Sequence, residues 1–277
     1  MLSKSTFLCY NFFGGFMDFV FKKKYGQNFL VDKNVINKIV QSIDCDKDTL
    51  VVEVGPGGGA LTEVISPLVK NVLAYEIDIS LKEKLDIVCN NNSNVKIIYQ
   101  DFLKVNLLED LKSYSYDKVY FLSNLPYYIT TPILERLLFS NIVFDKMFIM
   151  VQREAGDRLS SSVGSREYNA INVISAYHYC IKKIINIGRN SFYPIPNVDS
   201  VILSYSKKDR ALKVNDYSLF LRIVNDSFRQ KRKNLRNNLR NYDLDKIESV
   251  LLRNNFSLNS RAEEIPVEIF IEITNEL

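Results

Sequence analysis

The feature that most limits the fold of this chain is a glycine-rich stretch that directly follows an apolar run. Val51, Val52 and Val54 are typical of a buried strand, because β-branched side chains fit a pleated sheet. Residues 55–59 read Gly-Pro-Gly-Gly-Gly, which lets the backbone turn sharply and approach a ligand closely. From Leu61 the apolar spacing is that of a helix. A strand, glycine turn and helix can hold a nucleotide-like cofactor, but many tight connections have the same pattern.

Four more apolar segments indicate strands, with helical patterns between them. These strands are expected at residues 72–78, 95–99, 118–122 and 144–151. Glu76, Asp101 and Asn124 stand at the carboxyl ends of the second, third and fourth strands, as Gly55 does at the first. Alternating strands and helices favour an α/β fold with a parallel, Rossmann-like sheet, which binds ligands at this edge.

Helix boundaries follow from capping residues. Asp32 is expected to cap a helix that ends near Ile43, and Ser80 a helix through residue 88. We expect Thr131 to be an N-cap, with Pro132 at the first helical position.

The C-terminal part of the chain has a different pattern. Helices are expected at residues 153–159 and 167–177, strands at 181–187 and 200–205, and then only helices. The sequence therefore predicts three parts, which are an N-terminal extension over 1–21, a catalytic domain over 22–206 and a small helical domain over 207–277. We expect the extension to be disordered or not translated, with Met17 as an alternative start.

Composition excludes several classes of protein. Cysteines 9, 45, 89 and 180 are far apart, which argues against structural zinc and a disulfide framework and favours a reducing cytoplasm. His178 is the only histidine, and a structural or surface role is expected for it. No segment is long and apolar enough to predict a membrane span.

The acidic residues narrow the choice of cofactor. Glu76 lies 21 positions after Gly55, which suits a carboxylate that binds ribose hydroxyls. This spacing fits both a nicotinamide dinucleotide and S-adenosyl-L-methionine. Asp101 suits the exocyclic amine of an adenine that lies within the cleft, which favours the second.

The sequence Asn-Leu-Pro-Tyr at 124–127 indicates the chemistry. The exocyclic amine of adenine is a poor nucleophile because its lone pair is delocalised into the ring. The Asn124 side-chain oxygen and the Leu125 carbonyl can accept its N–H groups, while Pro126 stiffens the turn. Tyr127 offers a ring against which an extruded base can rest.

From about residue 24 onward the chain resembles the ribosomal RNA adenine dimethyltransferases, and within them the bacterial small-subunit enzymes. The resemblance rests on the glycine stretch and on segments 26–32, 124–132, 152–159, 192–200 and 229–239. Two departures are Ser123 and the pair Tyr168-Asn169, where relatives have glycine and Tyr-Gly. Neither departure falls on a residue expected to position the methyl transfer.

This resemblance implies a role for each motif. Asn28, Leu30 and Gly55 would enclose S-adenosyl-L-methionine, with Glu76 at its ribose and Asp101 at its adenine. Asn124 would border both the cofactor and the target amine, and Phe192 would pack against the target adenine opposite Tyr127. We expect direct methyl transfer to adenine N6, with no metal and no covalent intermediate.

A basic segment is the candidate RNA-binding surface. Between residues 222 and 240 a single acid, Asp226, accompanies a group of cations: Arg222, Arg229, Lys231, Arg232, Lys233, Arg236 and Arg240. Such a run is often only a solvated face, but it also suits contacts with phosphates, and the resemblance favours RNA. The expected partner is the small ribosomal subunit and its RNA, bound by a monomer.

Three alternatives remain open. One is a large-subunit adenine methyltransferase that confers macrolide resistance, although the Arg-Gln-Lys-Arg-Lys run at 229–233 is more similar to small-subunit enzymes. Another is a ribosome-assembly factor without catalysis, which the intact Asn124 motif argues against. A nicotinamide oxidoreductase is the most distant.

Overall fold

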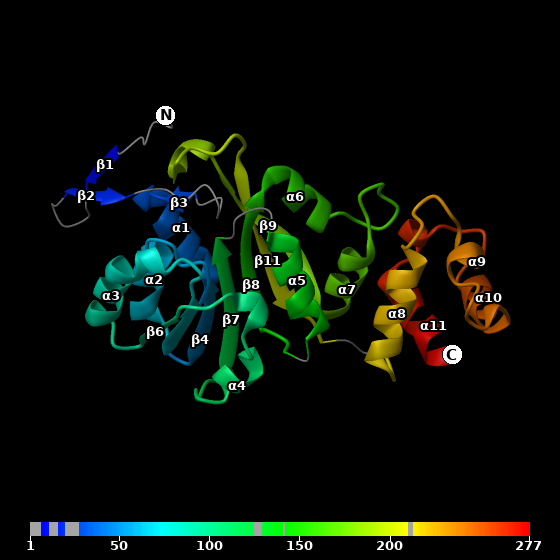
Figure 1. The fold of residues 1–277 in the computed structure, drawn as a ribbon. Helices are drawn as coiled ribbons and strands as arrows, with labels where there is room; N and C mark the ends of the chain where they lie inside the picture. The colour runs from blue at the N-terminus through cyan, green and yellow to red at the C-terminus, as the bar shows by residue number, and fades with distance from the viewer. Residues whose placement is uncertain (1–6, 11–15, 20–27, 125–128, 141, 210–212) are drawn as a thin grey trace.

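The computed structural model of the protein describes residues 7–10, 16–19, 28–124, 129–140, 142–209 and 213–277. A seven-stranded sheet is the centre of the larger lobe (Figure 1), with the strand order β6-β5-β4-β7-β8-β11-β9. The strands are β4 (Thr49–Val54), β5 (Asn71–Tyr75), β6 (Val95–Ile98), β7 (Lys118–Asn124), β8 (Lys146–Gln152), β9 (Tyr179–Ile187) and β11 (Ser200–Lys207). Strands β4 to β8 are parallel, and β11 is antiparallel to both of its neighbours. The predicted α/β, Rossmann-like fold is confirmed.

The order of the strands reverses between β4 and β7. From β4 the chain proceeds outward through β5 and β6, then returns to the other side of β4 with β7 and continues to β8. Val54 pairs with Ser123 across this junction, and the Ser123 hydroxyl donates to the Val54 carbonyl over 3.2 Å. Gly55 and Asn124 therefore emerge side by side at the point where such sheets bind ligands.

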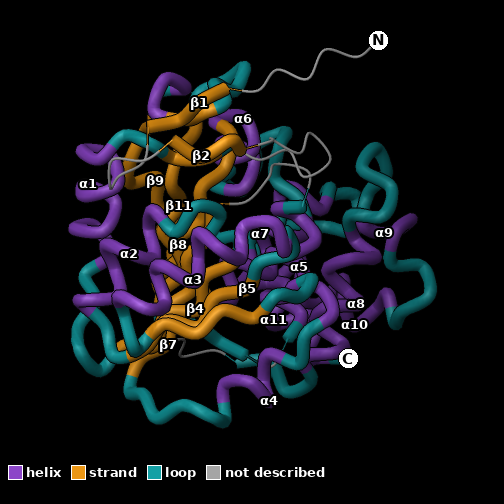
Figure 2. The backbone as a smooth tube through the Cα atoms, turned by 60° about the vertical axis from the view of Figure 1, so that its left-hand side comes forward, coloured by secondary structure: helices purple, strands orange, loops and turns teal. Residues whose placement is uncertain are grey.

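Helices cover both faces of the sheet, as Figures 1 and 2 show. On one face lie α1 (Lys33–Ile43), α2 (Ala60–Ile65) and α3 (Lys82–Asn91); on the other lie α4 (Leu107–Leu111), α5 (Thr130–Phe139) and α7 (Ala170–His178), with α6 (Arg153–Leu159) after β8. Asp32 caps α1 as predicted, because its carboxylate accepts from the backbone N–H groups of Asn34 and Val35. Ile36, Ile39, Val40 and Ile43 of α1 are buried because they share one face of the helix.

Two predicted helix starts were wrong. The residue that caps the turn before α3 is Asp78, whose carboxylate accepts from the Ser80 backbone N–H, so Ser80 is the capped residue and not the cap. Helix α5 begins at Thr130, which puts Thr131 and Pro132 inside its first turn. A proline is tolerated there because its missing N–H has no partner in the first turn of a helix.

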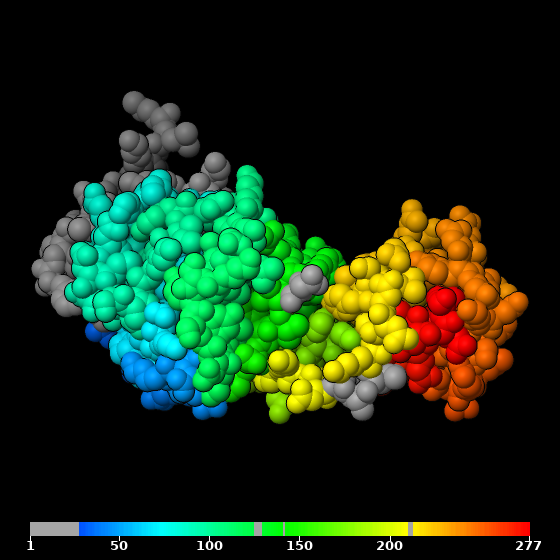
Figure 3. All heavy atoms as spheres, turned by 90° about the horizontal axis from the view of Figure 1, so that it is seen from below, coloured from blue at the N-terminus to red at the C-terminus, as the bar shows by residue number. Residues whose placement is uncertain are grey.

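Beyond Lys207 the described chain contains no strand. It forms α8 (Tyr217–Ser227), α9 (Leu235–Asn238), α10 (Leu244–Arg253) and α11 (Val267–Glu276), which make a smaller lobe at one end of the molecule (Figure 3). Phe220 and Val224 of α8 belong to the same apolar core as Ile174 of α7. The two lobes thus share buried surface.

His178 contributes to the junction between the lobes. Its Nε2 lies 2.7 Å from the Tyr217 hydroxyl, which itself donates to the Leu138 carbonyl over 2.8 Å. Because that hydroxyl has a single proton, the ring nitrogen of His178 is the donor in the first contact. The histidine therefore links α7 to α8, and its expected structural role is supported.

Two pairs of short strands complete the fold. Strand β3 (Phe29–Leu30) pairs with β10 (Phe192–Tyr193), and β1 (Phe7–Tyr10) pairs with β2 (Phe16–Phe19). The rest of the N-terminal extension lies outside the described residues, so its expected disorder stays a prediction. Within the described chain, every helix is too short or too polar to cross a bilayer.

Candidate active site

The glycine turn has the backbone conformation that its sequence predicts. Gly55, Gly57 and Gly59 have φ angles of 74°, 58° and 80°, which lie in the left-handed region that glycine adopts without steric cost. A Cβ atom at Gly57 would lie 3.1 Å from the Phe29 ring, and one at Gly59 would lie 2.8 Å from Val88. The turn is therefore closely covered by side chains on both sides.

Glu76 stabilises the loop that follows β5. Its side chain is 4% exposed, and its two oxygens accept from the backbone N–H groups of Gly57, over 3.1 Å, and Asp78, over 2.8 Å. Burial raises the pKa of this carboxyl, while the backbone donors act in the opposite direction. A carboxylate has about four acceptor positions, so these backbone donors leave acceptor capacity for a ribose hydroxyl.

Asp101, which is predicted to bind the adenine of the cofactor, also caps the short helical turn at residues 102–104. Its Oδ1 accepts from the Leu103 backbone N–H over 3.0 Å, and its Oδ2 lies 4.0 Å from Lys104 Nζ. The side chain remains 25% exposed, which leaves the carboxyl group open to contact with an adenine amine. Ile77 lies next to Glu76 with 48% of its surface exposed, and its apolar side chain suits the face of a flat base.

Asn124 is joined to the segment that precedes β3. Its Nδ2 donates to the backbone carbonyl of Asn28 over 3.4 Å. Because a carbonyl oxygen only accepts, this bond identifies Nδ2 as the group that faces Asn28, so Oδ1 is on the other side of the amide. That oxygen is the acceptor predicted for the target amine.

The pairing of β3 with β10 brings two more predicted residues together. Leu30 is 5% exposed and pairs with Phe192, which is 2% exposed, and the Val31 N–H donates to the Ser191 carbonyl over 2.9 Å. Segment 28–31 therefore contacts the glycine turn, Asn124 and the Phe192 strand. Leu125, Pro126 and Tyr127 lie outside the described residues, and the role expected for Phe192 stays a prediction.

A buried acid lies directly beneath the glycine turn. Glu53, the penultimate residue of β4, is 2% exposed, and its Oε2 accepts from the Thr62 hydroxyl over 2.6 Å. Burial raises the pKa of Glu53 to about 7, and the nearby charge of Glu76 acts in the same direction. The site therefore contains a carboxyl group that ionises near neutral pH.

Comparisons with known proteins place the chain in a family. Residues 18–277 match the sequence model of a family described as ribosomal RNA adenine dimethylase. The chain belongs to the ribosomal RNA adenine dimethylase family. The chain is 43% identical over 258 residues to the ribosomal RNA small subunit methyltransferase A of Aster yellows witches'-broom phytoplasma, with 91% of this chain and 94% of that protein covered. The enzyme of the same name from Staphylococcus aureus is 39% identical over 230 residues, with 82% and 77% covered.

Solved structures confirm the fold of the dimethylase. A dimethyladenosine transferase from Plasmodium falciparum has a TM-score of 0.73 at 21% identity and covers 88% of this chain and 95% of its own. The 23S rRNA methyltransferase ErmE has a TM-score of 0.68 at 21% identity, with 90% and 99% covered. At these identities the likeness concerns the fold alone.

The predicted RNA-binding residues of the dimethylase lie on the smaller lobe. Arg229, Lys231, Arg232 and Lys233 are exposed in the turn between α8 and α9, and Arg236 on α9 forms an ion pair of 3.4 Å with Glu248. The turn has a defined backbone, because the Asn238 amide donates to the carbonyls of residues 227, 230 and 233 over 2.7, 3.3 and 3.5 Å. The cations of this turn are therefore exposed on an ordered support.

The sequence alone did not assign a role to several residues of this site. Phe29 lies in a segment that the resemblance covers, but only the structure places its ring against Gly57. Glu53 is a carboxylate among buried β-branched residues, and that anomaly is the signal that could have identified it. In the described chain no group of three or more potential metal ligands occurs.

Proposed function

We propose that this dimethylase transfers methyl groups from S-adenosyl-L-methionine to the N6 amines of two adjacent adenines in small-subunit ribosomal RNA. The adenines would lie in a hairpin near the 3′ end of that RNA and be modified during assembly of the subunit. The observation that carries the proposal is the convergence of Asn28, Gly57, Glu76 and Asn124 at the switch point of the sheet. The names and identities of the bacterial relatives support the small subunit as the substrate.

The residues present fit this methyl donor. The left-handed glycine turn lets backbone approach a ligand, the buried Glu76 retains acceptor capacity for a ribose, and Ile77 and Asp101 suit the apolar face and the amine of an adenine. S-adenosyl-L-methionine supplies an electrophilic methyl group when it is bound. The chain itself positions the acceptor, and it needs no metal for this role.

Asn124 would position the adenine amine. Its Oδ1 can accept one N–H group, and the bond from Nδ2 to the Asn28 carbonyl holds the amide plane. An acceptor that fixes the N–H group directs the lone pair of the amine toward the methyl group, which is catalysis by orientation. The amine becomes strongly acidic after methylation, so its proton can leave to water without a general base.

Further proposals concern the domains of the protein and its contacts with RNA. Residues 22–206 would form the catalytic domain and residues 207–277 the RNA-binding domain, in a monomer that acts in the cytoplasm. The exposed cations between α8 and α9 support contacts with phosphates, which position a protein on RNA without reading its sequence. Substrate choice would then depend on the shape of the RNA.

The deciding experiment supplies methyl-labelled S-adenosyl-L-methionine to unmodified small and large ribosomal subunits. We expect label only in the small subunit, on two adjacent adenines that carry N6,N6-dimethyl groups. Label in the large subunit would instead support the alternative activity. The absence of label in both subunits, with normal binding of the methyl donor, would contradict catalysis on mature or assembling subunits.

A further inference from the structure

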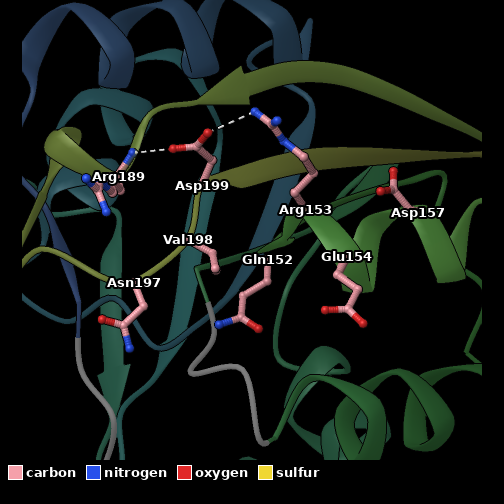
Figure 4. A pocket seen from close by; sticks show the side chains of 8 residues that line it. All are labelled: Gln152, Arg153, Glu154, Asp157, Arg189, Asn197, Val198 and Asp199. Carbon is pink, nitrogen blue, oxygen red and sulfur yellow. Dashed lines mark hydrogen bonds and ion pairs between the residues drawn. The ribbon is translucent and has the colours of Figure 1, made fainter.

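A cleft of about 460 Å³ (Figure 4) lies at the end of β8, the strand that pairs with β7 and its terminal residue Asn124. It is formed where β8 ends and where the chain enters β11, and Gln152, Asn197 and Val198 line it. None of these three residues has a role in the site described above. The volume lies in the range of clefts that bind small ligands, and it is sufficient for a nucleotide.

Two of the three carboxylates in the cleft already have partners. Asp199 accepts from Arg153 Nη2 over 2.9 Å and from the Arg189 backbone N–H over 3.0 Å, and Asp157 is paired with Lys183. Figure 4 shows the Arg153–Asp199 contact at one side of the cleft. The side-chain amides of Gln152 and Asn197 point away from that contact. These ion pairs fix the wall of the cleft.

Other polar groups in the cleft are available to a ligand. Among the described residues, the side chains of Gln152, Glu154, Asn197 and Arg189 have no hydrogen bond or ion pair with the protein. Val198 adds an apolar surface that is 43% exposed. Two amides, a guanidinium and an apolar face form the combination that recognises a base edge, a phosphate and a base face.

The distance from the cleft to Asn124 is about the length of one or two nucleotides. Asn124 pairs with Met150 on the neighbouring parallel strand, and Gln152 is two residues farther along that strand. At about 4.8 Å between strands and about 3.3 Å per residue, the Cα atoms of Asn124 and Gln152 are roughly 8 Å apart. Stacked nucleotides are about 3.4 Å apart, and an unstacked pair reaches farther.

We propose that this cleft binds the nucleotide adjacent to the adenine being methylated. Gln152 and Asn197 contact the edge of its base, Val198 contacts its face and Arg189 contacts its phosphate. Amide side chains suit an adenine in particular, because they pair with its N6 and N7 positions. The inference rests on the proposed function and deepens it, since it assigns residues that recognise a pair of adenines and not a single one.

The test is a double-mutant cycle in which the protein and the RNA are changed separately and together. The protein variant combines Gln152→Ala with Asn197→Ala, and the RNA variant lacks the base next to the target adenine. Both are compared with the unaltered forms in small subunits reconstituted without methylation. The measured quantity is kcat/KM for methylation of the remaining adenine. The control combines Asn90→Ala with Asn91→Ala, which removes two exposed amides at the C-terminal end of α3.

We expect the double variant of the cleft to lose about tenfold in kcat/KM on intact subunits, the discrimination of one good amide–base contact. The missing base should cost the unaltered protein a similar factor, and the double variant should lose nothing further on that RNA. Equal losses by the variant on both RNAs, or no loss on either, would overturn the proposal. Unchanged binding of S-adenosyl-L-methionine verifies that the variant is folded.

Methyl transfer by the unaltered protein to intact subunits distinguishes a failure of this inference from a failure of the proposed function. If that protein transfers no methyl groups there, the proposed function fails and the cleft loses its substrate. If it does so and the cycle shows no coupling, only the role of the cleft is wrong.

Discussion

The side-chain amide of Asn124 donates to the backbone carbonyl of Asn28, 96 positions earlier in the sequence, over 3.4 Å. This bond joins the end of β7 to the segment that covers the glycine turn. It also fixes which side of the amide faces the substrate, because the carbonyl of Asn28 can only accept. Asn28, predicted to enclose the cofactor, and Asn124, predicted to border both the cofactor and the target amine, are thus parts of one arrangement.

The first prediction concerns Asn124. Replacing it with Ala removes the acceptor for the amine, and we expect methyl transfer to fall by at least about 10²-fold, the usual cost of losing one positioned hydrogen-bonding group. Asn124→Asp should also be impaired, since it keeps an acceptor but cannot donate to Asn28. The assay is methyl incorporation into unmodified small subunits, with binding of the methyl donor measured in parallel.

Ser123→Ala is the matched control for this prediction. It removes only the hydroxyl that donates to the Val54 carbonyl, and we expect methyl transfer to persist. Near-normal turnover by Asn124→Ala would show that the role assigned to Asn124 is wrong.

The second prediction uses two glycines with similar backbone conformations. Gly57 and Gly164 have φ angles of 58° and 83°, so an alanine at either position costs about 1–2 kcal/mol of backbone strain. A Cβ atom at Gly57 also presses on the Phe29 ring at 3.1 Å, whereas none of the described atoms lies within 4 Å at Gly164. We expect both variants to be less stable, and only Gly57→Ala to bind S-adenosyl-L-methionine more weakly.

Thermal unfolding and calorimetric titration with the methyl donor measure the two effects separately. Equal affinities for the two variants would show that the contact of Phe29 with Gly57 does not shape the cofactor site.

Much of the fold was predictable because its signals are local. Apolar strands, glycines with a required positive φ and the Asp32 cap each depend on a few neighbouring residues. The starts of α5 and of the turn before α3 were less predictable, because Asp78 and Ser80 are both good capping residues and helix ends vary by one or two residues.

The candidate site was predictable only in part, for a different reason. Residues at strand ends meet at one edge of a parallel sheet, so the grouping of Gly55, Glu76 and Asn124 follows from the order of the strands. The contact of Phe29 with Gly57 and the bond from Asn124 to Asn28 depend on how segment 28–31 folds back over the sheet. No local pattern encodes such a long-range contact.

The third prediction concerns the pH dependence of stability through Glu53. In the folded protein its pKa is about 7, whereas a glutamate in an unfolded chain has a pKa of about 4.3. Below about pH 4 the carboxyl is neutral in both states. As the pH rises to 7 the unfolded state loses this proton first, so stability is lost, by about 1.4 kcal/mol per pH unit at most.

Glu53→Gln removes this titration. We expect the free energy of unfolding of the variant, relative to the unaltered protein, to rise by about 3 kcal/mol between pH 4 and pH 7 and then to level off. Denaturant unfolding at intervals of half a pH unit measures it. A difference that stays constant over this range would mean that the buried carboxyl does not titrate as described.

The last prediction concerns the cations between α8 and α9. Replacing Lys231, Lys233 and Arg232 with Ala should weaken binding to the small subunit and reduce the slope of log K against log salt by about 0.7–0.9 for each phosphate that the variant no longer neutralises. The stability of the lobe should not change, because these side chains are exposed and Asn238 still holds the turn. Replacing Lys47, Lys70 and Lys112, three exposed lysines of the larger lobe, is the control of equal charge. A salt slope that is the same for both triple variants would remove the turn from the RNA interface.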